Sequence, residues 1–210
     1  MIDAIAAASA AMRSQERQLA NIANDVANVS TAGYKPAGQA ALQGALMPTG
    51  GSLDLAVLGN GYFRLIRSTD FSRNGSFSLD GQGRVVDGNG NLLDPPLTVP
   101  EGAELRVSPS GDVSAAAGGK LVPLGRIELS SFSNPDGLAA AGDGTLDATA
   151  ASGPPHPAST QVAQGYLEGS NSDLADAAVS QILTSSTYSA LGSVVHTADS
   201  MQQSLLDLFA

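Results

Sequence analysis

Two histidines, His156 and His196, are the side chains of this chain best suited to metal binding or acid–base chemistry. His156 stands in the proline-rich run Pro154–Pro157, and His196 stands in an apolar-striped segment near the C-terminus. A metal site would need further Asp or Glu ligands from distant parts of the chain, and cysteine is absent. A loop and a helix flank explain the two histidines better, so we expect no metal site.

Other patterns that suggest chemistry fail in detail. Serine is abundant, but the Gly-x-Ser-x-Gly turn that exposes a nucleophile is missing. Asp87–Asn91 begins like a calcium loop, yet Leu92 stands where that loop needs glycine and Thr98 where it needs glutamate. Gly59–Gly61 precedes a strand pattern and not a helix, which argues against a dinucleotide cradle. We therefore expect no catalytic residue and no cofactor, and a small hydrolase is the alternative from the enzyme class.

Bulk composition excludes further classes. The 210 residues carry a net charge of −10, with Lys and Arg totalling 10. Binding to nucleic acid or to an anionic membrane surface needs a basic face, so neither is expected. No run approaches the ~18 apolar residues of a membrane-spanning helix. The N-terminus lacks the basic segment of a signal peptide, so we expect a cytosolic protein or one exported without a cleaved signal.

The clearest elements are two terminal helices. Apolar residues recur every seven positions through residues 3–29, with a second series offset by three: Ile5, Met12, Leu19 and Val26, then Ala8, Ile22 and Val29. A second stripe runs through residues 173–208: Tyr188, Leu191, Val195, Ala198, Met201, Leu205 and Leu208. Such stripes need a partner helix. Periodicity alone supports ordinary core helices and an intermolecular coiled coil about equally.

Between the helices the apolar period changes to two, with turns rich in Gly, Asn and Asp. This spacing predicts short antiparallel strands. The strongest local signal is Leu53–Leu58 and Tyr62–Ile66 around Gly59–Gly61, which predicts a hairpin. Residues 37–52 predict a loop with at most a short helix around Ala40–Leu46.

The predicted fold class is α+β, with paired N- and C-terminal helices of coiled-coil type and an inserted antiparallel β-rich domain. The helical domain takes residues 1–36 and 168–210. The β-rich domain takes residues 37–167, and Gln161–Leu167 is its last strand, returning toward the termini.

Several segments resemble the flagellar basal-body rod and hook protein family. They occur in the family's order over nearly the whole chain. The segments are Asn21–Lys35, Leu55–Phe63, Ser72–Gly83, Gly125–Leu138, Gln164–Asn171 and Thr197–Met201.

The resemblance implies a non-catalytic structural subunit of the bacterial flagellum, of the rod type. In that family the terminal helices form the inner coiled-coil layer of a helical polymer that transmits torque, and the β domain forms the outer layer. The implied partners are copies of itself, other rod and hook subunits, the flagellar type III export apparatus and ring proteins around the rod, with no nucleic acid and no small-molecule substrate. The implied location is the periplasm-spanning rod, reached without a cleaved signal peptide.

Within this interpretation, the assembly interface is predicted to comprise Ile5, Met12, Leu19, Ile22, Val26, Leu191, Val195, Ala198, Leu205 and Leu208. Gly33, Tyr34, Lys35 and Pro36 are predicted to act as a hinge between helix and β domain. The alternative function is a secreted binding module or an assembly cap that recognises a ligand or partner through its β domain.

The chain departs from the family pattern in two places. Ser185–Ser189 keeps only the tyrosine of the Gln-Arg-Ala-Tyr-Glu run common in the family. The Gly33-to-Leu53 connection is shorter than distal-rod proteins usually carry. The chain is also too small for a hook protein, and the choice between a proximal and a distal rod position stays open.

Overall fold

The computed structural model describes residues 2–36, 38–66, 70–142 and 144–209; the side chains of residues 2–4, 142, 205, 206, 208 and 209 lie outside that description. The chain divides into two compact units. One joins the residues up to Ala27 with those from Ser172 onward, and the other is Asn28–Asn171. We call them the helical unit and the β unit. The predicted domain boundaries at 36/37 and 167/168 stay a prediction, although both lie within the β unit.

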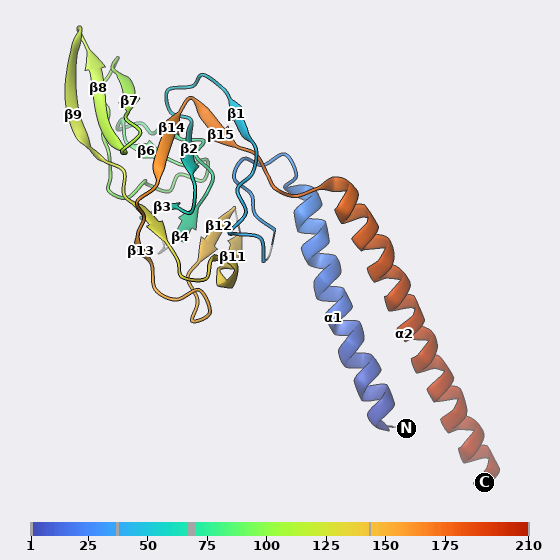
Figure 1. Ribbon diagram of the computed structural model, residues 1–210. Coiled ribbons are helices and arrows are strands. Elements are labelled where there is room, and N and C mark those ends of the chain that lie inside the picture. Colours follow the sequence, from blue (N-terminus) through green and yellow to red (C-terminus); the bar gives the residue numbers. More distant parts are fainter. Residues whose placement is uncertain (1, 37, 67–69, 143, 210) are drawn as a thin grey trace. The chain divides into compact units, whose positions relative to one another are not determined.

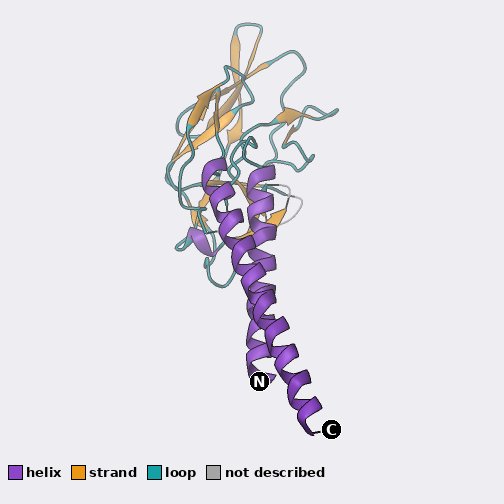
Figure 2. Ribbon diagram, turned by 90° about the vertical axis from the view of Figure 1, so that its right-hand side faces the viewer, coloured by secondary structure: helices purple, strands orange, loops and turns teal. Residues whose placement is uncertain are grey.

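The helical unit consists of α1 (Ile2–Ala27) and α2 (Leu174–Phe209), which lie side by side and antiparallel in both views (Figures 1 and 2). Both helices fall within two residues of the predicted ends. Asp173 caps α2, because its Oδ1 accepts hydrogen bonds from the amides of Ala175 at 2.7 Å and Asp176 at 3.4 Å. Among its described residues the unit has no other helix or strand, so each helix buries its apolar stripe mainly against the other.

The β unit is built from short strands that pair antiparallel throughout its described part (Figure 1). The main sheet has the order β11 (Ala139–Gly142), β12 (Thr145–Asp147), β4 (Asp70–Ser72), β3 (Tyr62–Arg64), β10 (Leu129–Ser131) and β13 (His156–Pro157). A three-stranded sheet contains β7 (Glu104–Val107), β8 (Asp112–Ala117) and β9 (Lys120–Arg126). Two-stranded pairs are β1 (Leu46–Pro48) with β15 (Tyr166–Glu168), β2 (Leu55–Leu58) with β14 (Gln161–Gln164), and β5 (Ser78–Leu79) with β6 (Val85–Val86). Pro135–Gly137 forms a 3-10 turn. The predicted α+β class is confirmed.

Leucine and valine form most of the core of the β unit, as a chain this poor in aromatic residues requires. The short strands and the segments between them supply it: Leu55, Val57, Leu65, Val85, Leu93, Leu97, Val99, Leu105, Val113, Ile127, Leu129 and Val162, with Phe63 and Phe77. A second cluster surrounds Phe71, whose ring meets that of Phe132 edge-on at 4.8 Å. Burial of these side chains holds strands from distant parts of the sequence together.

The predicted hairpin around Gly59–Gly61 is wrong. β2 pairs with β14, whereas β3 pairs with β4 and β10. The Arg73 guanidinium determines the turn, because its Nη1 donates hydrogen bonds to the carbonyls of Gly59 at 2.6 Å and Gly61 at 2.5 Å. The Asn-Gly signal marks a turn correctly, but it cannot show that a buried cation from further along the chain occupies it.

Two other strand predictions need correction. Residues 40–42 form a turn and residues 43–45 have no regular secondary structure, so the short helix is absent there, and Leu46–Pro48 then forms β1, which was not predicted. The predicted last strand is interrupted at Gly165, which has a φ of 79° and divides β14 from β15. That break lets β14 pair with β2 while β15 pairs with β1.

No helix in the described part of the chain combines the length and the apolar character that crossing a membrane requires.

Two carboxylates oppose each other on the main sheet, where Asp70 of β4 pairs in register with Asp147 of β12. Burial and the hydrogen bond and charge of Asp147 raise the pKa of Asp70 to about 6. The folded state therefore binds the proton more tightly than the unfolded chain. Stability that is present at pH 4 is lost as the pH rises through 6.

We predict that Asp70→Asn removes this loss and raises the free energy of unfolding at pH 7.5 by about 0.5–1 kcal/mol, allowing for solvent screening of a partly exposed pair. Urea unfolding at pH 4 and pH 7.5 measures it, with Glu101→Gln at an exposed turn as control. A gain at pH 4 equal to that at pH 7.5 would rule out repulsion between the carboxylates as the cause.

Candidate functional site

Three charged side chains meet in the interior of the β unit. Lys35 Nζ lies 2.5 Å from Glu168 Oε1, and Arg73 Nε lies 2.9 Å from Glu168 Oε2. The relative exposures of the side chains are 1% for Lys35, 3% for Arg73 and 0% for Glu168. We call these residues the ion cluster. Charges are buried only when they are paired, so each member depends on the others.

Backbone groups complete the coordination of the ion cluster. Glu168 Oε1 also accepts a hydrogen bond from the amide of Gly44 at 2.7 Å, and Lys35 Nζ donates to the carbonyl of Leu42 at 2.5 Å. The Arg73 guanidinium stands 5.6 Å from the ring centre of Tyr62, within cation–π range. Arg73 Nε and Glu168 Oε2 have no hydrogen bond of good geometry in the described structure, so their contact is mainly a charge pair.

Burial also shifts the titration of groups at the cluster. Loss of hydration lowers the pKa of Lys35, and the hydrogen bond and charge of Glu168 oppose that shift. Burial raises the pKa of Tyr62 to about 12, so its hydroxyl stays protonated and donates to the carbonyl of Ala40 at 2.7 Å. The arrangement has the contacts of a structural clamp, and it exposes no group to a substrate.

The ion cluster joins the two places where the chain enters and leaves the β unit. The amide of Gly33 donates to the carbonyl of Glu168 at 2.7 Å, and the amide of Asn171 donates to the carbonyl of Tyr34 at 3.4 Å. The first and last segments of the unit therefore lie side by side. They are fixed by backbone hydrogen bonds as well as by the Lys35–Glu168 pair.

All four predicted hinge residues, Gly33, Tyr34, Lys35 and Pro36, are buried in this part of the β unit. Their role as a hinge stays a prediction. Arg73 and Glu168 were not predicted as site residues, although each lies in a segment that carried the family resemblance. Both stand among polar residues and glycines, so no local feature of the sequence marks them as buried.

Gly33 has no room for a side chain. Its φ is +66°, and a Cβ there would lie 2.3 Å from the backbone carbon of Arg73. We predict that Gly33→Ala lowers the free energy of unfolding of the β unit by about 3–5 kcal/mol, because the strained backbone and the clash add.

The matched control is Gly38→Ala, with a φ of +75° and no heavy atom within 4 Å of the added Cβ. We expect Gly38→Ala to lower the free energy of unfolding only by the strain of an alanine at positive φ, about 1–2 kcal/mol. Guanidinium unfolding of both variants compares them. Equal destabilisation would show that close packing of Gly33 on Arg73 is unimportant.

The predicted assembly residues line the inner faces of the two helices where the structure describes them. Ile22 is buried, and the remainder are partly buried: Ile5, Met12, Leu19, Val26, Leu191, Val195 and Ala198. Tyr188 reaches across the helical unit, where its hydroxyl donates to Glu16 Oε1 at 3.2 Å. The side chains of Leu205 and Leu208 lie outside the described residues. Within one chain these residues join α1 to α2, and we call them the seam. Their part in assembly stays a prediction.

A second apolar stripe on α2 remains exposed, and it was not separated from the seam by sequence reasoning. Its members recur every three or four residues or at multiples of that spacing: Val179 is 57% exposed, Leu183 63%, Val194 52% and Met201 55%. We call these four residues the outer stripe. Met201, which the sequence pattern placed in the apolar stripe of residues 173–208, belongs to the outer stripe. In a helix, the spacing from Leu191 of the seam, and from Thr184, which is buried on α2, puts these residues on a different face.

A third face of α2 carries small hydroxyl residues whose polar groups are satisfied within the helix. Ser189, Ser193, Ser200 and Ser204 each donate a side-chain hydrogen bond of 2.9–3.2 Å to the carbonyl four residues earlier. Such bonds let a serine face pack against an apolar neighbour without an unsatisfied hydroxyl. α2 therefore has several faces compatible with burial, whereas α1 exposes Arg13, Glu16 and Arg17.

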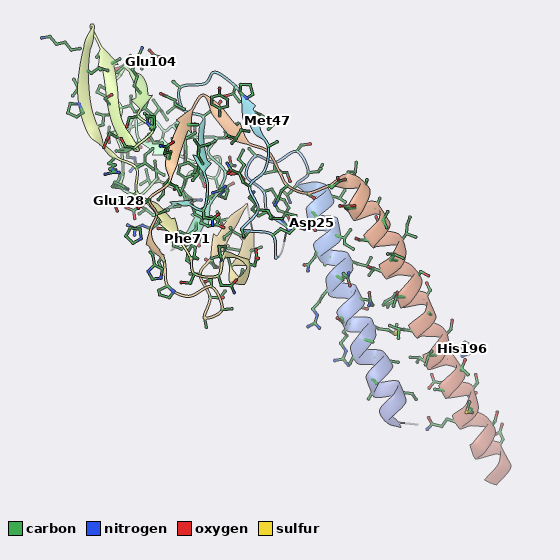
Figure 3. All side chains as sticks on the ribbon, viewed as in Figure 1. Asp25, Met47, Phe71, Glu104, Glu128 and His196 are labelled. Carbon is green, nitrogen blue, oxygen red and sulfur yellow. The ribbon has the colours of Figure 1, made fainter. Side chains whose placement is uncertain are left out.

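Both histidines are exposed: His156 lies on β13, and His196 lies on α2, where Figure 3 labels it. No group of three or more His, Asp or Glu side chains in the described part of the chain is placed to hold a metal ion.

Comparison with known proteins agrees with this geometry. A family model described as "Flagellar hook protein FlgE/F/G D1 domain" matches residues 56–115, and one described as "Flagellar basal body rod FlgEFG protein C-terminal" matches residues 163–208. The flagellar basal-body rod protein FlgG of Caulobacter vibrioides is 30% identical over 260 aligned positions that cover 99% of each chain. FlgG of Agrobacterium fabrum is 30% identical over 94% of this chain and 96% of its own length. FlgG of Bacillus subtilis is 32% identical over 78% of this chain and 68% of its own.

Proposed function

Because this chain belongs to the flagellar basal-body rod protein family and is a structural subunit of the rod, we propose that it assembles through α2 and transmits torque through helix contacts between copies. The observation that carries the proposal is the outer stripe. The monomer already buries one stripe of α2 against α1, and it leaves a second stripe exposed. A helix that is apolar on more than one face is typical of a helix surrounded by others.

The seam and the outer stripe have different roles in this proposal. The seam, which includes Ile22 and Leu191, holds the two helices of one copy together. The outer stripe then packs against helices of neighbouring copies, and the serine face of α2 allows close approach on a further side. This proposal keeps the terminal helices as the assembly element, and it moves the contact between copies to residues other than those of the seam.

The ion cluster serves force transmission in the same proposal. A torque carried by the helices must reach the β unit through the two segments at its entry and exit. Lys35 and Glu168 fix those segments to each other and to the core. A clamp of buried, mutually dependent charges resists shear because separating them leaves uncompensated charge in the interior.

We further propose the finer assignments that the resemblance implies. The partners are copies of this chain and other rod and hook subunits, together with the flagellar type III export apparatus and the ring proteins around the rod. Export proceeds without a cleaved signal peptide, and the assembled rod spans the periplasm. The protein has no catalytic activity. The relatives support this reading over a secreted binding module or cap, because each is named as a rod protein.

Deletion of the gene in the source bacterium, with re-expression of a tagged chain, tests the proposal. Loss of swimming and of hooks on deletion, restoration on re-expression, and recovery of the tagged chain in isolated hook–basal bodies are expected. Motile deletion cells, with the tagged chain absent from hook–basal bodies, would contradict it.

A further inference from the structure

Exposed apolar side chains gather at two separate places on the described part of the β unit. The first is the β1–β15 ribbon, where Leu46 is 38% exposed, Met47 46% and Tyr166 41%. The second is the end of the β8–β9 hairpin, where Leu121 is 64% exposed and Val122 47%. We call them the ribbon patch and the hairpin patch. Figure 1 shows β1 and β15 apart from the end of the β8–β9 hairpin on the same unit.

The ribbon patch is rigid and has two faces: by the strand register, Leu46 and Tyr166 lie on one face of the ribbon and Met47 lies on the other. β1 and β15 pair in register from Leu46 opposite Glu168 to Pro48 opposite Tyr166. Glu168 belongs to the ion cluster, and the amide of Gly169 donates to the carbonyl of Ala45 at 2.7 Å beside it. Met47 lies on the outer strand of this ribbon (Figure 3). Since its backbone is fixed by buried charges, the patch is pre-organised to receive a partner.

The hairpin patch lies at the end of a hairpin that is only two strands wide, β8 and β9. Consecutive residues of a strand face opposite sides, so Leu121 and Val122 make both faces of the hairpin end apolar. Gly118 and Gly119 form its turn with φ values of 56° and 78°. An element that is apolar on both faces loses most exposed area when it docks against a broader surface.

Docking of the hairpin by strand addition is disfavoured. β9 is an edge strand, but it contains Pro123, and its pairing with β8 shifts register between Val113 and Ser114. Proline and bulges are the usual means by which an edge strand resists added strands. At the other edge of this sheet, the Gln164 side chain donates to the carbonyl of Leu105 and accepts from the amide of Val107. A partner of the hairpin would therefore contact its side chains and not add a strand to its edge.

The charges beside the two patches are opposite. Lys120 is exposed next to Leu121 on the hairpin. The ribbon ends where Pro48 pairs with Tyr166, and Asp54 lies beside that end: its carboxylate accepts a hydrogen bond from the Thr49 hydroxyl at 2.5 Å, and its carbonyl accepts one from the amide of Gly165 at 2.8 Å. When the hairpin patch meets the ribbon patch, attraction between Lys120 and Asp54 favours one orientation of the contact.

We propose that the hairpin patch of one copy docks on the ribbon patch of a second copy, with Lys120 directed toward Asp54. Two different patches on one unit make a heterologous contact, which propagates head to tail and suits a polymer. The inference rests on the proposed rod function and adds to it a contact between β units.

Cysteine cross-linking tests the contact, because the chain has no cysteine. Met47→Cys and Leu121→Cys are combined in one full-length chain. Hook–basal bodies isolated from complemented cells, and the purified chain at high concentration, are oxidised and run on a non-reducing gel. A disulfide requires close approach of the two Cα atoms, so it reports this contact specifically.

A ladder of dimers, trimers and larger species is expected from the double variant, and none from either single variant. A mixture of the two single variants is expected to stop at dimers, and it also tests the contact if the double variant assembles poorly. The matched control pairs Met47→Cys with Leu79→Cys, since Leu79 is 41% exposed but belongs to neither patch; it is expected to give no ladder.

Three results would overturn the contact: no ladder in either preparation, dimers from one single variant, or an equal ladder from the control. Recovery of the chain in hook–basal bodies without a ladder would overturn the contact and leave the rod function standing. A ladder from the purified chain, together with absence of the chain from hook–basal bodies, would support the contact and contradict the rod function.

Discussion

Glu168→Gln is expected to lower the free energy of unfolding of the β unit by about 3–5 kcal/mol, because it leaves two buried cations without their anion. Lys35 and Arg73 would then face each other's charge in the interior, and Lys35 and Gly44 would lose a charged acceptor. Guanidinium unfolding followed by tyrosine fluorescence measures the change, since Tyr62 lies against Arg73. The matched control is Glu104→Gln, whose pair with Arg106 at 3.7 Å is exposed and is worth less than about 1 kcal/mol.

A double variant separates charge burial from loss of packing. Lys35→Met with Glu168→Gln removes one cation together with the anion, so a single buried cation remains, and Arg73 keeps its bonds to Gly59 and Gly61. We expect this double variant to be about 1–2 kcal/mol more stable than Glu168→Gln alone. Destabilisation equal to the sum of the two single variants would show that the three charges do not act as a unit.

Leu183→Glu with Val194→Glu is expected to abolish incorporation into hook–basal bodies and swimming while the monomer stays folded. Both side chains are more than half exposed in one copy, so the charges are solvated there, and unfolding is expected to change by less than about 0.5 kcal/mol. In the proposed assembly the same positions face apolar helices, where an unpaired carboxylate is strongly unfavourable.

The control for this pair is Gln18→Glu on the exposed face of α1, which is expected to swim normally. Circular dichroism of each purified variant checks that the helices are retained. Normal swimming of the Leu183→Glu and Val194→Glu variant would show that the outer stripe makes no contact between copies.

The helices were predictable because their pattern is long and strict. Apolar residues repeat over many turns, and Asp173 marks the start of α2 by local chemistry, because its side chain caps the helix. The division of α2 into a seam and an outer stripe was less accessible. Met201 fits either series by spacing, and only the position of α1 decides that it is exposed.

The β unit was predictable as a set of short strands but not as a pairing scheme. β1 has exposed residues and a proline, so no alternation marks it, and its partner β15 lies more than a hundred residues away. The ion cluster was missed for a similar reason. Lys35, Arg73 and Glu168 come from distant segments, and nothing local distinguishes a buried charge from a solvated one.

Accessibility of a single cysteine at Leu183, on the outer stripe, tests most directly the claim that α2 packs against neighbouring copies. The chain has no native cysteine, so Leu183→Cys reports alone, with Gln18→Cys on α1 as reference. We predict rapid maleimide labelling of both variants as monomers, and strong protection of Leu183→Cys relative to Gln18→Cys in isolated hook–basal bodies. Labelling of Leu183→Cys at the monomer rate in intact rods would show that the outer stripe is not buried by neighbouring copies.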